Sequence, residues 1–105
     1  MDTDLQEFDE LLASTEKSII IMWSASWCNP CKRLKPLFYK MSEGNNNMLF
    51  VIIDIEENPT VTNKYGIRKI PTIKMFKNSE EVDTLTDNSE ESLRAFVNKW
   101  SVPSV

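Results

Sequence analysis

The sequence predicts an α/β protein whose mixed sheet is covered by helices on both faces. Stretches rich in Ile and Val, which are typical of buried strands, alternate with stretches whose apolar residues recur at helical spacing. Near the end of the chain, two strand-like stretches are separated only by a short turn, which predicts an antiparallel hairpin. Strands separated by helices usually pair in parallel, so the hairpin makes the expected sheet mixed.

The first half of the chain predicts a helix, a strand and a second helix. Leucines and a phenylalanine recur at helical spacing over residues 4–14. Residues 18–24 form a continuous apolar run rich in Ile, the pattern of a strand buried on both faces. A second helix is expected from Pro30, because an early helical position needs no N–H, and its apolar stripe continues to Met41.

The second half predicts a strand, a short helix, the hairpin and a last helix. The expected bounds are residues 48–55 for the strand, 58–65 for the short helix, 72–76 and 82–85 for the hairpin strands, and 89–100 for the last helix. The sheet therefore has four strands, or five if residues 1–4 add an edge strand. A typical strand has about 5–6 residues, so that fifth strand is expected to be missing or vestigial.

Length and composition indicate one ordinary globular domain over residues 1–105. The 12 basic and 16 acidic residues are interspersed and give a net charge of -4, which favours neither a nucleic-acid groove nor a basic membrane patch. No stretch approaches the ~20 apolar residues of a membrane-spanning helix. The acidic start lacks the basic and apolar regions of a signal peptide, so we expect a cytoplasmic protein in a reducing compartment.

The two cysteines, Cys28 and Cys31, form a Cys-x-x-Cys pair between the first strand and the second helix. A pair at such a junction is typical of a redox dithiol. At the first turn of a helix, free backbone N–H groups and the helix dipole favour a thiolate, which lowers the pKa of the first cysteine. We therefore expect the chain to move electrons between dithiols and disulfides.

Other roles for the cysteine pair are weaker. A zinc site needs about four ligands, and this chain has two cysteines and no histidine, so we predict no metal site. A structural disulfide that closes so short a loop would restrict the unfolded chain little. No G-x-G-x-x-G fingerprint is present, so we expect no bound cofactor.

Several separated motifs show that the chain resembles the thioredoxin family. They are Trp-Cys-x-Pro-Cys-Lys at residues 27–32, Pro36 in the following helix, Lys-Tyr-Gly-Ile-Arg-x-Ile-Pro-Thr at residues 64–72, and Phe-Lys-Asn at residues 76–78. The resemblance implies the thioredoxin fold, with a sheet flanked by four helices. It implies that Cys28 is the nucleophile, that Cys31 resolves the mixed disulfide, and that Pro71 is a cis-proline facing them. The implied substrate-binding residues are Trp27, Asn29, Pro30, Ile70 and Pro71.

Some positions depart from the family pattern. The family carries a buried Asp six residues before the first cysteine, and a Lys often faces it from the next strand. Met22 and Ile52 take those two places here, so Cys31 is expected to lack a general base. Glycines near the docking surface are replaced by Asn29, Lys69 and Asp87. These replacements are either ordinary loop substitutions or a cause of altered partner choice.

The expected function is that of a thioredoxin-like protein disulfide reductase, a monomeric electron-transport protein that acts on protein disulfides. An external enzyme, thioredoxin reductase or an equivalent, would recycle it. Two alternatives stay open. One is an oxidant or isomerase of the same fold, although Asn29-Pro30 lacks the His that such proteins usually place between the cysteines. The other is a docking module, which the missing Asp favours and the retained cysteines disfavour.

Overall fold

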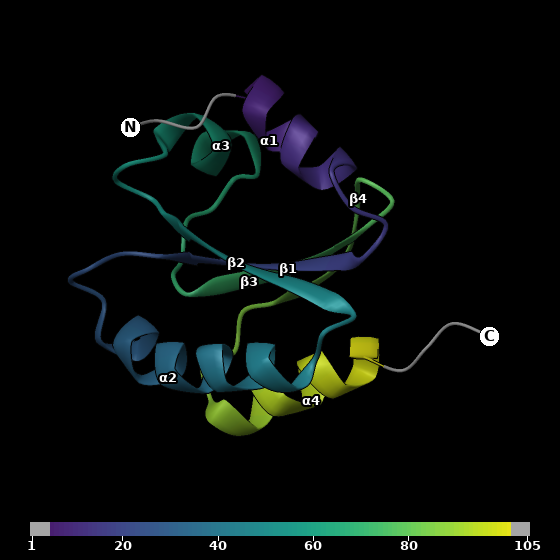
Figure 1. Cartoon of the computed structure of the whole chain (residues 1–105). Helices are drawn as coiled ribbons and strands as arrows, with labels where there is room; N and C mark the ends of the chain where they lie inside the picture. Colours follow the sequence, from purple (N-terminus) through teal and green to yellow (C-terminus); the bar gives the residue numbers. More distant parts are fainter. Residues whose placement is uncertain (1–4, 102–105) are drawn as a thin grey trace.

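The computed structural model describes residues 5–101 and contains the predicted elements in the predicted order (Figure 1). The elements are α1 (Leu5–Ala13), β1 (Ser18–Ser24), α2 (Asn29–Gly44), β2 (Met48–Asp54), α3 (Pro59–Lys64), β3 (Thr72–Lys77), β4 (Glu80–Leu85) and α4 (Glu90–Ser101). The α/β class is thereby confirmed. The fifth strand considered for residues 1–4 lies outside the described residues.

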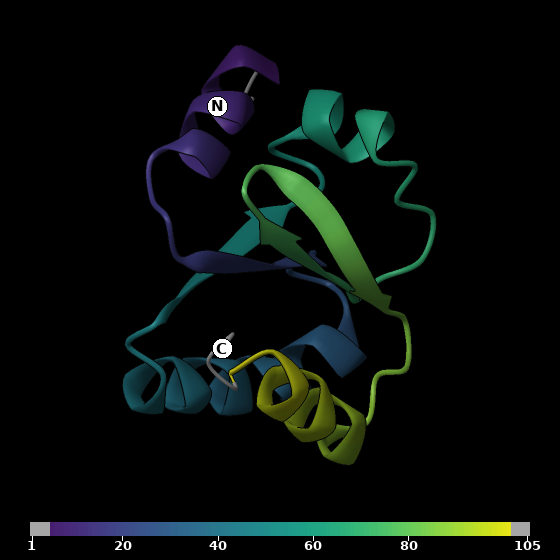
Figure 2. The ribbon, with the colours of Figure 1, turned by 90° about the vertical axis from the view of Figure 1, so that its right-hand side faces the viewer.

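The four strands form one mixed sheet, as expected, and their order in the sheet is β2-β1-β3-β4. β1 pairs in parallel with β2 and antiparallel with β3, and β3 pairs antiparallel with β4. Helices α1 and α3 cover one face of this sheet, and α2 and α4 cover the other (Figures 1 and 2). Because β1 lies inside the sheet, the loop that follows it carries the cysteines out from the middle of the molecule.

Each face of the sheet has its own hydrophobic core, because alternate residues of β1 point to opposite faces. The α1/α3 face is aromatic: the ring centroid of Phe8 lies 6.4 Å from that of Trp23, 5.3 Å from Tyr65 and 5.9 Å from Phe76. The core under α2 and α4 is mainly aliphatic and contains Met22. The strand that leads to the cysteines is therefore buried on both sides, as its sequence predicted.

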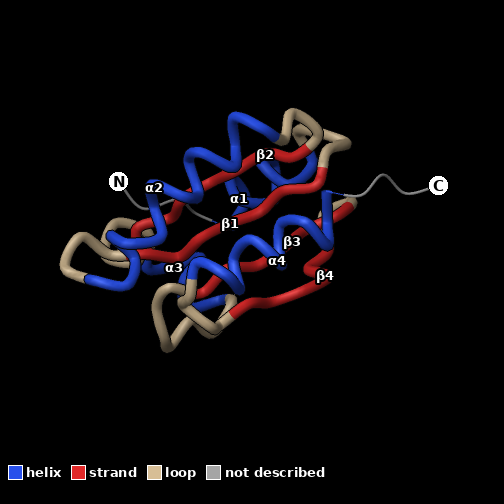
Figure 3. The backbone as a smooth tube through the Cα atoms, turned by 90° about the horizontal axis from the view of Figure 1, so that it is seen from below, coloured by secondary structure: helices blue, strands red, loops and turns tan. Residues whose placement is uncertain are grey.

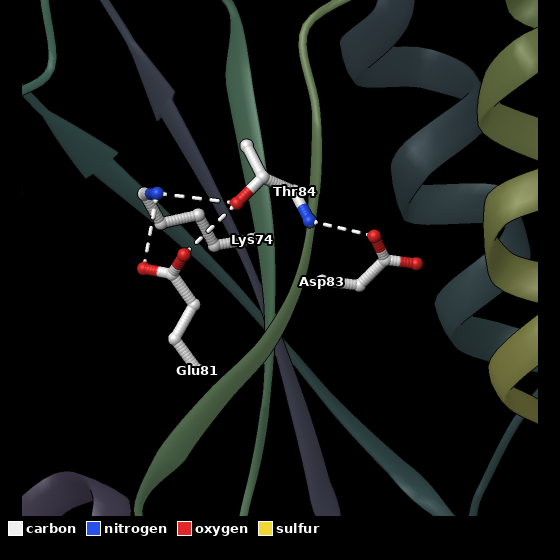
Figure 4. Close-up of polar contacts among 4 residues, drawn as sticks. All are labelled: Lys74, Glu81, Asp83 and Thr84. Atoms are coloured by element: carbon white, nitrogen blue, oxygen red, sulfur yellow. Dashed lines mark hydrogen bonds and ion pairs between the residues drawn. The ribbon is translucent and has the colours of Figure 1, made fainter.

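The β3–β4 hairpin holds the edge of the sheet. Its two turn residues, Asn78 and Ser79, have φ values of 52° and 68°, and two consecutive residues with positive φ match the twist of a tight hairpin. The ammonium of Lys74 on β3 lies 3.0 Å from the Glu81 carboxylate and donates to the Thr84 hydroxyl at 3.2 Å (Figure 4). These contacts tie β4 to β3 through side chains as well as through the backbone.

Three strand boundaries differ slightly from the predicted ones, and one of them is the end of β3 at Lys77 rather than at residue 76. β2 ends at Asp54 rather than at residue 55, because the Asp54 carboxylate accepts the backbone N–H groups of Glu56 and Glu57 at 2.8 and 3.2 Å and turns the chain. β4 begins at Glu80, two residues earlier than expected, because the tight turn brings Glu80 directly opposite Lys77.

Candidate active site

The cysteine pair lies where the loop after β1 enters α2. Cys28 is the N-cap of this helix and has extended backbone angles, φ −86° and ψ 110°. Its sulfur accepts the backbone N–H of Cys31 at 3.3 Å, and its carbonyl accepts the N–H of Lys32 at 3.1 Å. Pro30 stands in the first turn, where no N–H is required. The start of the helix therefore directs an N–H group at the Cys28 sulfur, the arrangement that favours a thiolate.

Cys28 and Cys31 form a disulfide, and their Cα atoms are 5.3 Å apart. Cys28 is 5% exposed, whereas Cys31 is fully buried. Both pack with Ala25, and Ile55 and Ile70 lie against the same cluster. A group that approaches from solvent therefore meets the Cys28 sulfur first, which is the order that the predicted roles require.

The loop before β3 lies beside the dithiol. Its Ile70–Pro71 bond is cis, as the family resemblance implied. Ile70 contacts the cysteine cluster and Pro71 is buried. The hydroxyl of Thr72 donates a hydrogen bond to the carbonyl of Lys69, which fixes the loop next to the strand. The fold thus brings together two segments that are distant in the sequence.

The side chain of Trp27 is exposed to solvent but is not free to turn. It is 61% exposed, and its indole N–H donates to the Glu56 carboxylate at 2.7 Å. The backbone of Glu56 is in turn held by the Asp54 carboxylate. Sequence reasoning missed Glu56 and Asp54. The acidic residues directly after a buried strand were the available signal, since such residues often begin a turn.

Met22 and Ile52 are neighbours, as the family alignment predicted. They are Cα partners in the β1–β2 pair, and Met22 is completely buried. Met22 belongs to the core under α2, and Ile52 packs against that core. Two apolar side chains therefore occupy the places where the family pattern has an acid and a base.

The polar residues that replace glycines lie around this site in different ways. Asn29 and Lys69 are exposed. The Asp87 carboxylate accepts the Ser92 hydroxyl at 2.5 Å and the backbone N–H of Ser89 at 3.1 Å. The Ser92 and Ser89 hydrogen bonds, together with the nearby Lys69 ammonium, lower the pKa of Asp87. Asp87 is thus engaged at the start of α4 and is negatively charged at neutral pH.

Between residues 5 and 101, no three Cys, Asp or Glu side chains gather as a metal site would need. None of the helices in that range is long and apolar enough to cross a membrane.

Comparison with known proteins agrees with this geometry. The family model named Thioredoxin matches residues 1–99. Thioredoxin 1 of Plasmodium falciparum is 34% identical over 99 residues, covering 94% of this chain and 94% of its own, and Homo sapiens thioredoxin is 32% identical over 93 residues, covering 88% and 89%. A solved structure of Plasmodium falciparum thioredoxin has 35% sequence identity and a TM-score of 0.87, covering 93% of this chain and 95% of the other. With a Cys-x-x-Cys disulfide at a helix start, the chain belongs to the thioredoxin family and is a dithiol–disulfide oxidoreductase.

Proposed function

We propose that Cys28 is the nucleophile and Cys31 the resolving thiol of a protein disulfide reductase. The Cys28 thiolate attacks one sulfur of a target disulfide, forms a mixed disulfide and releases the other target sulfur as a thiolate. Cys31 then loses its proton and attacks the Cys28 sulfur, which forms the Cys28–Cys31 disulfide and releases the second target sulfur. Two electrons pass to the target in each cycle. The observation that carries this proposal is that Cys28 is the N-cap of α2 and keeps 5% of its surface exposed, whereas Cys31 is fully buried.

The target would dock on five residues around the dithiol: Trp27, Asn29, Pro30, Ile70 and Pro71. The exposed and fixed indole of Trp27 offers a large apolar surface. Pro71 has no N–H, so an extended target segment would pair with the backbone of Ile70 beside it. Contact between Ile70 and the cysteine cluster supports this placement of the target chain.

Membership of the thioredoxin family implies protein substrates and a reductase partner in general. We place this chain, as a monomer of one domain over residues 1–105, in a reducing compartment such as the cytoplasm. There an external enzyme of the thioredoxin reductase type would return Cys28 and Cys31 to the dithiol state after each cycle. The reversible cysteine pair supports this placement.

The test is reduction of insulin by dithiothreitol, followed as turbidity, with the wild type and with Cys31→Ser. Wild type should accelerate precipitation, because dithiothreitol regenerates the dithiol. Cys31→Ser cannot resolve its own mixed disulfide and should accelerate precipitation much less; mixed with insulin without dithiothreitol, the reduced variant should accumulate as a mixed disulfide that mass spectrometry detects. If the wild type gives no acceleration, the reductase proposal fails and the docking module becomes the better explanation.

A measured reduction potential distinguishes the proposed reductase from one further candidate, an oxidant or isomerase of the same fold. Equilibration with glutathione buffers measures the ratio of dithiol to disulfide. Asn29-Pro30 between the cysteines supports a reducing protein, since no His is present to stabilise the Cys28 thiolate further. A strongly oxidising potential would therefore favour the oxidant.

A further inference from the structure

A pocket lies next to the dithiol, between the first turns of α2 and the start of α4. Its volume is about 310 Å³. The lining residues are Arg33, Leu34, Asn88, Ser89 and Glu90. Leu34 is a fully buried core residue, whereas Arg33 and Glu90 are exposed and stand on different helices. Figure 3 shows α2 and α4 side by side on this face of the sheet.

The charges at the two helix starts differ. The first turn of α2 contains no acidic residue, and Lys32 and Arg33 stand near its positive end, which the helix dipole disfavours. The first turn of α4 contains Glu90 and Glu91, which the dipole favours. The dipole of α4 therefore stabilises the negative charge of Glu90, whereas the dipole of α2 does not stabilise the positive charge of Arg33.

Arg33 forms no ion pair with the described residues, although Glu90 lines the same pocket. Lys74 with Glu81 and Lys99 with Asp83 are ion pairs within the chain, and both involve β4. The nearby Asp87 is held by Ser92 and Ser89 instead. The guanidinium of Arg33 can therefore meet a carboxylate from outside the chain.

The distance between Cys28 and Arg33 indicates which residue of a bound target would lie at the pocket. Arg33 follows Cys28 by five residues on the same helix, which corresponds to about 7.5 Å along the axis. An extended chain advances about 3.3 Å per residue. A target segment that places its cysteine at Cys28 would therefore place a residue two or three positions away at the pocket.

We propose that this pocket is a specificity subsite in which Arg33 binds an acidic side chain two or three residues from the attacked cysteine of the target. The proposal rests on the reductase function proposed above. The carboxylate of the acidic residue meets the exposed guanidinium of Arg33. Since the pair is exposed, its effect is a preference among targets, a few-fold in rate and weaker at high salt.

The experiment uses peptides with one cysteine, blocked as a mixed disulfide with 5-thio-2-nitrobenzoate. Attack by Cys28 on the peptide sulfur releases the coloured thiolate, which leaves readily because its pKa is low. Glu, Gln or Lys is placed two or three residues to either side of the cysteine. Rates are compared as ratios within each protein variant, so any change in the Cys28 thiolate itself cancels.

The wild type should react about three- to fivefold faster with the best Glu peptide than with its Lys counterpart at low salt. Arg33→Glu should abolish or reverse that ratio. Lys40→Glu makes the same charge change seven residues further along α2 and should leave the ratio close to that of the wild type. Thermal unfolding of each variant checks that it is folded.

Two outcomes overturn different claims. If Arg33→Glu changes the Glu-to-Lys ratio no more than Lys40→Glu does, the subsite is wrong, while the reductase function stands. If the wild type releases no coloured thiolate from any peptide, including the Gln peptide, the reductase function itself fails. A preference that stays the same at high salt also contradicts a role for the Arg33 charge.

Discussion

The dithiol end and the β4 edge of the molecule use their polar residues differently. At the β4 edge, Asp83 accepts hydrogen bonds from the Lys99 ammonium and the Trp100 indole, both at 2.9 Å, and the Lys74–Glu81 pair lies on the opposite face of the same strand. Around the dithiol, the described cations of α2 form no ion pair, and the one long-range side-chain bond is that between Trp27 and Glu56.

This difference indicates a division of work. The carboxylates of Glu81 and Asp83 on β4 are paired within the chain and help to hold this edge strand in place. The cations near Cys28 form no ion pair within the described chain, so they can interact with a partner protein or with the Cys28 thiolate. Substitutions at the dithiol end should therefore change rates and preferences, and substitutions at the β4 edge should change stability alone.

Met22→Asp should break the separation, because it should change both rate and stability. A carboxylate at this buried position would accept the Cys31 proton and speed resolution of the mixed disulfide, by up to about 10²-fold near neutral pH. It should also destabilise the fold by about 2–4 kcal/mol, since Ile52 offers no opposite charge. Stopped-flow reduction of a peptide disulfide and urea unfolding measure the two effects.

Met22→Asn is the matched control for that experiment. It introduces a polar side chain of nearly the same shape but no base, so it should destabilise the fold without speeding the reaction. The pH at which turnover rises should be lower in Met22→Asp than in the wild type. Equal rates and equal pH profiles for all three proteins would show that the missing carboxylate does not limit turnover.

The two cysteines should differ in reactivity by about tenfold or more in the reduced protein. Cys28 is at the helix start and 5% exposed, while Cys31 is fully buried, so iodoacetamide should modify Cys28 first. The apparent pKa from the pH dependence of alkylation should be below the free value of about 8.5. Peptide mapping after brief labelling identifies the modified residue, and preferential labelling of Cys31 would contradict the assigned roles.

Asp83→Asn should lower stability without changing turnover. The hydrogen bond from Lys99 above all, and also the one from the Trp100 indole, holds the pKa of Asp83 below its ordinary value of 3.8. Loss of the charged acceptor should cost about 1–2 kcal/mol, because two donors at the end of α4 lose it. Glu80→Gln on the same strand is the control and should change stability by less than about 0.5 kcal/mol.

The contribution of Asp83 to the free energy of unfolding should depend on pH. Since its pKa is lowered in the folded state, its contribution is present above the unfolded pKa and is lost as the pH falls through the folded pKa. The difference in unfolding free energy between wild type and Asp83→Asn should thus be largest above about pH 5 and should shrink below about pH 4. A difference that is constant from pH 7 to pH 3 would mean that charge is not its cause.

The sequence predicted the element order because hydrophobic periodicity and turn residues are local signals. It located the dithiol and the cis-proline because the motifs that carry the resemblance contain them. It could not locate the Trp27–Glu56 bond, since a contact between side chains 29 residues apart depends on how the loop after β2 folds. The contacts of Asp83 with Lys99 and Trp100 could not be predicted for the same reason. The pocket beside Arg33 forms only when α2 and α4 pack together.

Glu56→Gln should give the smallest effect, confined to the dithiol end. Gln can still accept the indole N–H, but the bond loses its charged acceptor and weakens. Trp27 should then sample more orientations, so KM for a protein disulfide should rise about two- to threefold while kcat stays the same. Glu57→Gln is the matched control, because Glu57 is a neighbouring exposed acid whose only described bond is that of its backbone N–H to Asp54. If the two variants behave alike, loss of an acid near the dithiol explains the effect, and orientation of Trp27 does not. A change in unfolding free energy equal to that of Asp83→Asn would show that this end of the molecule also serves stability.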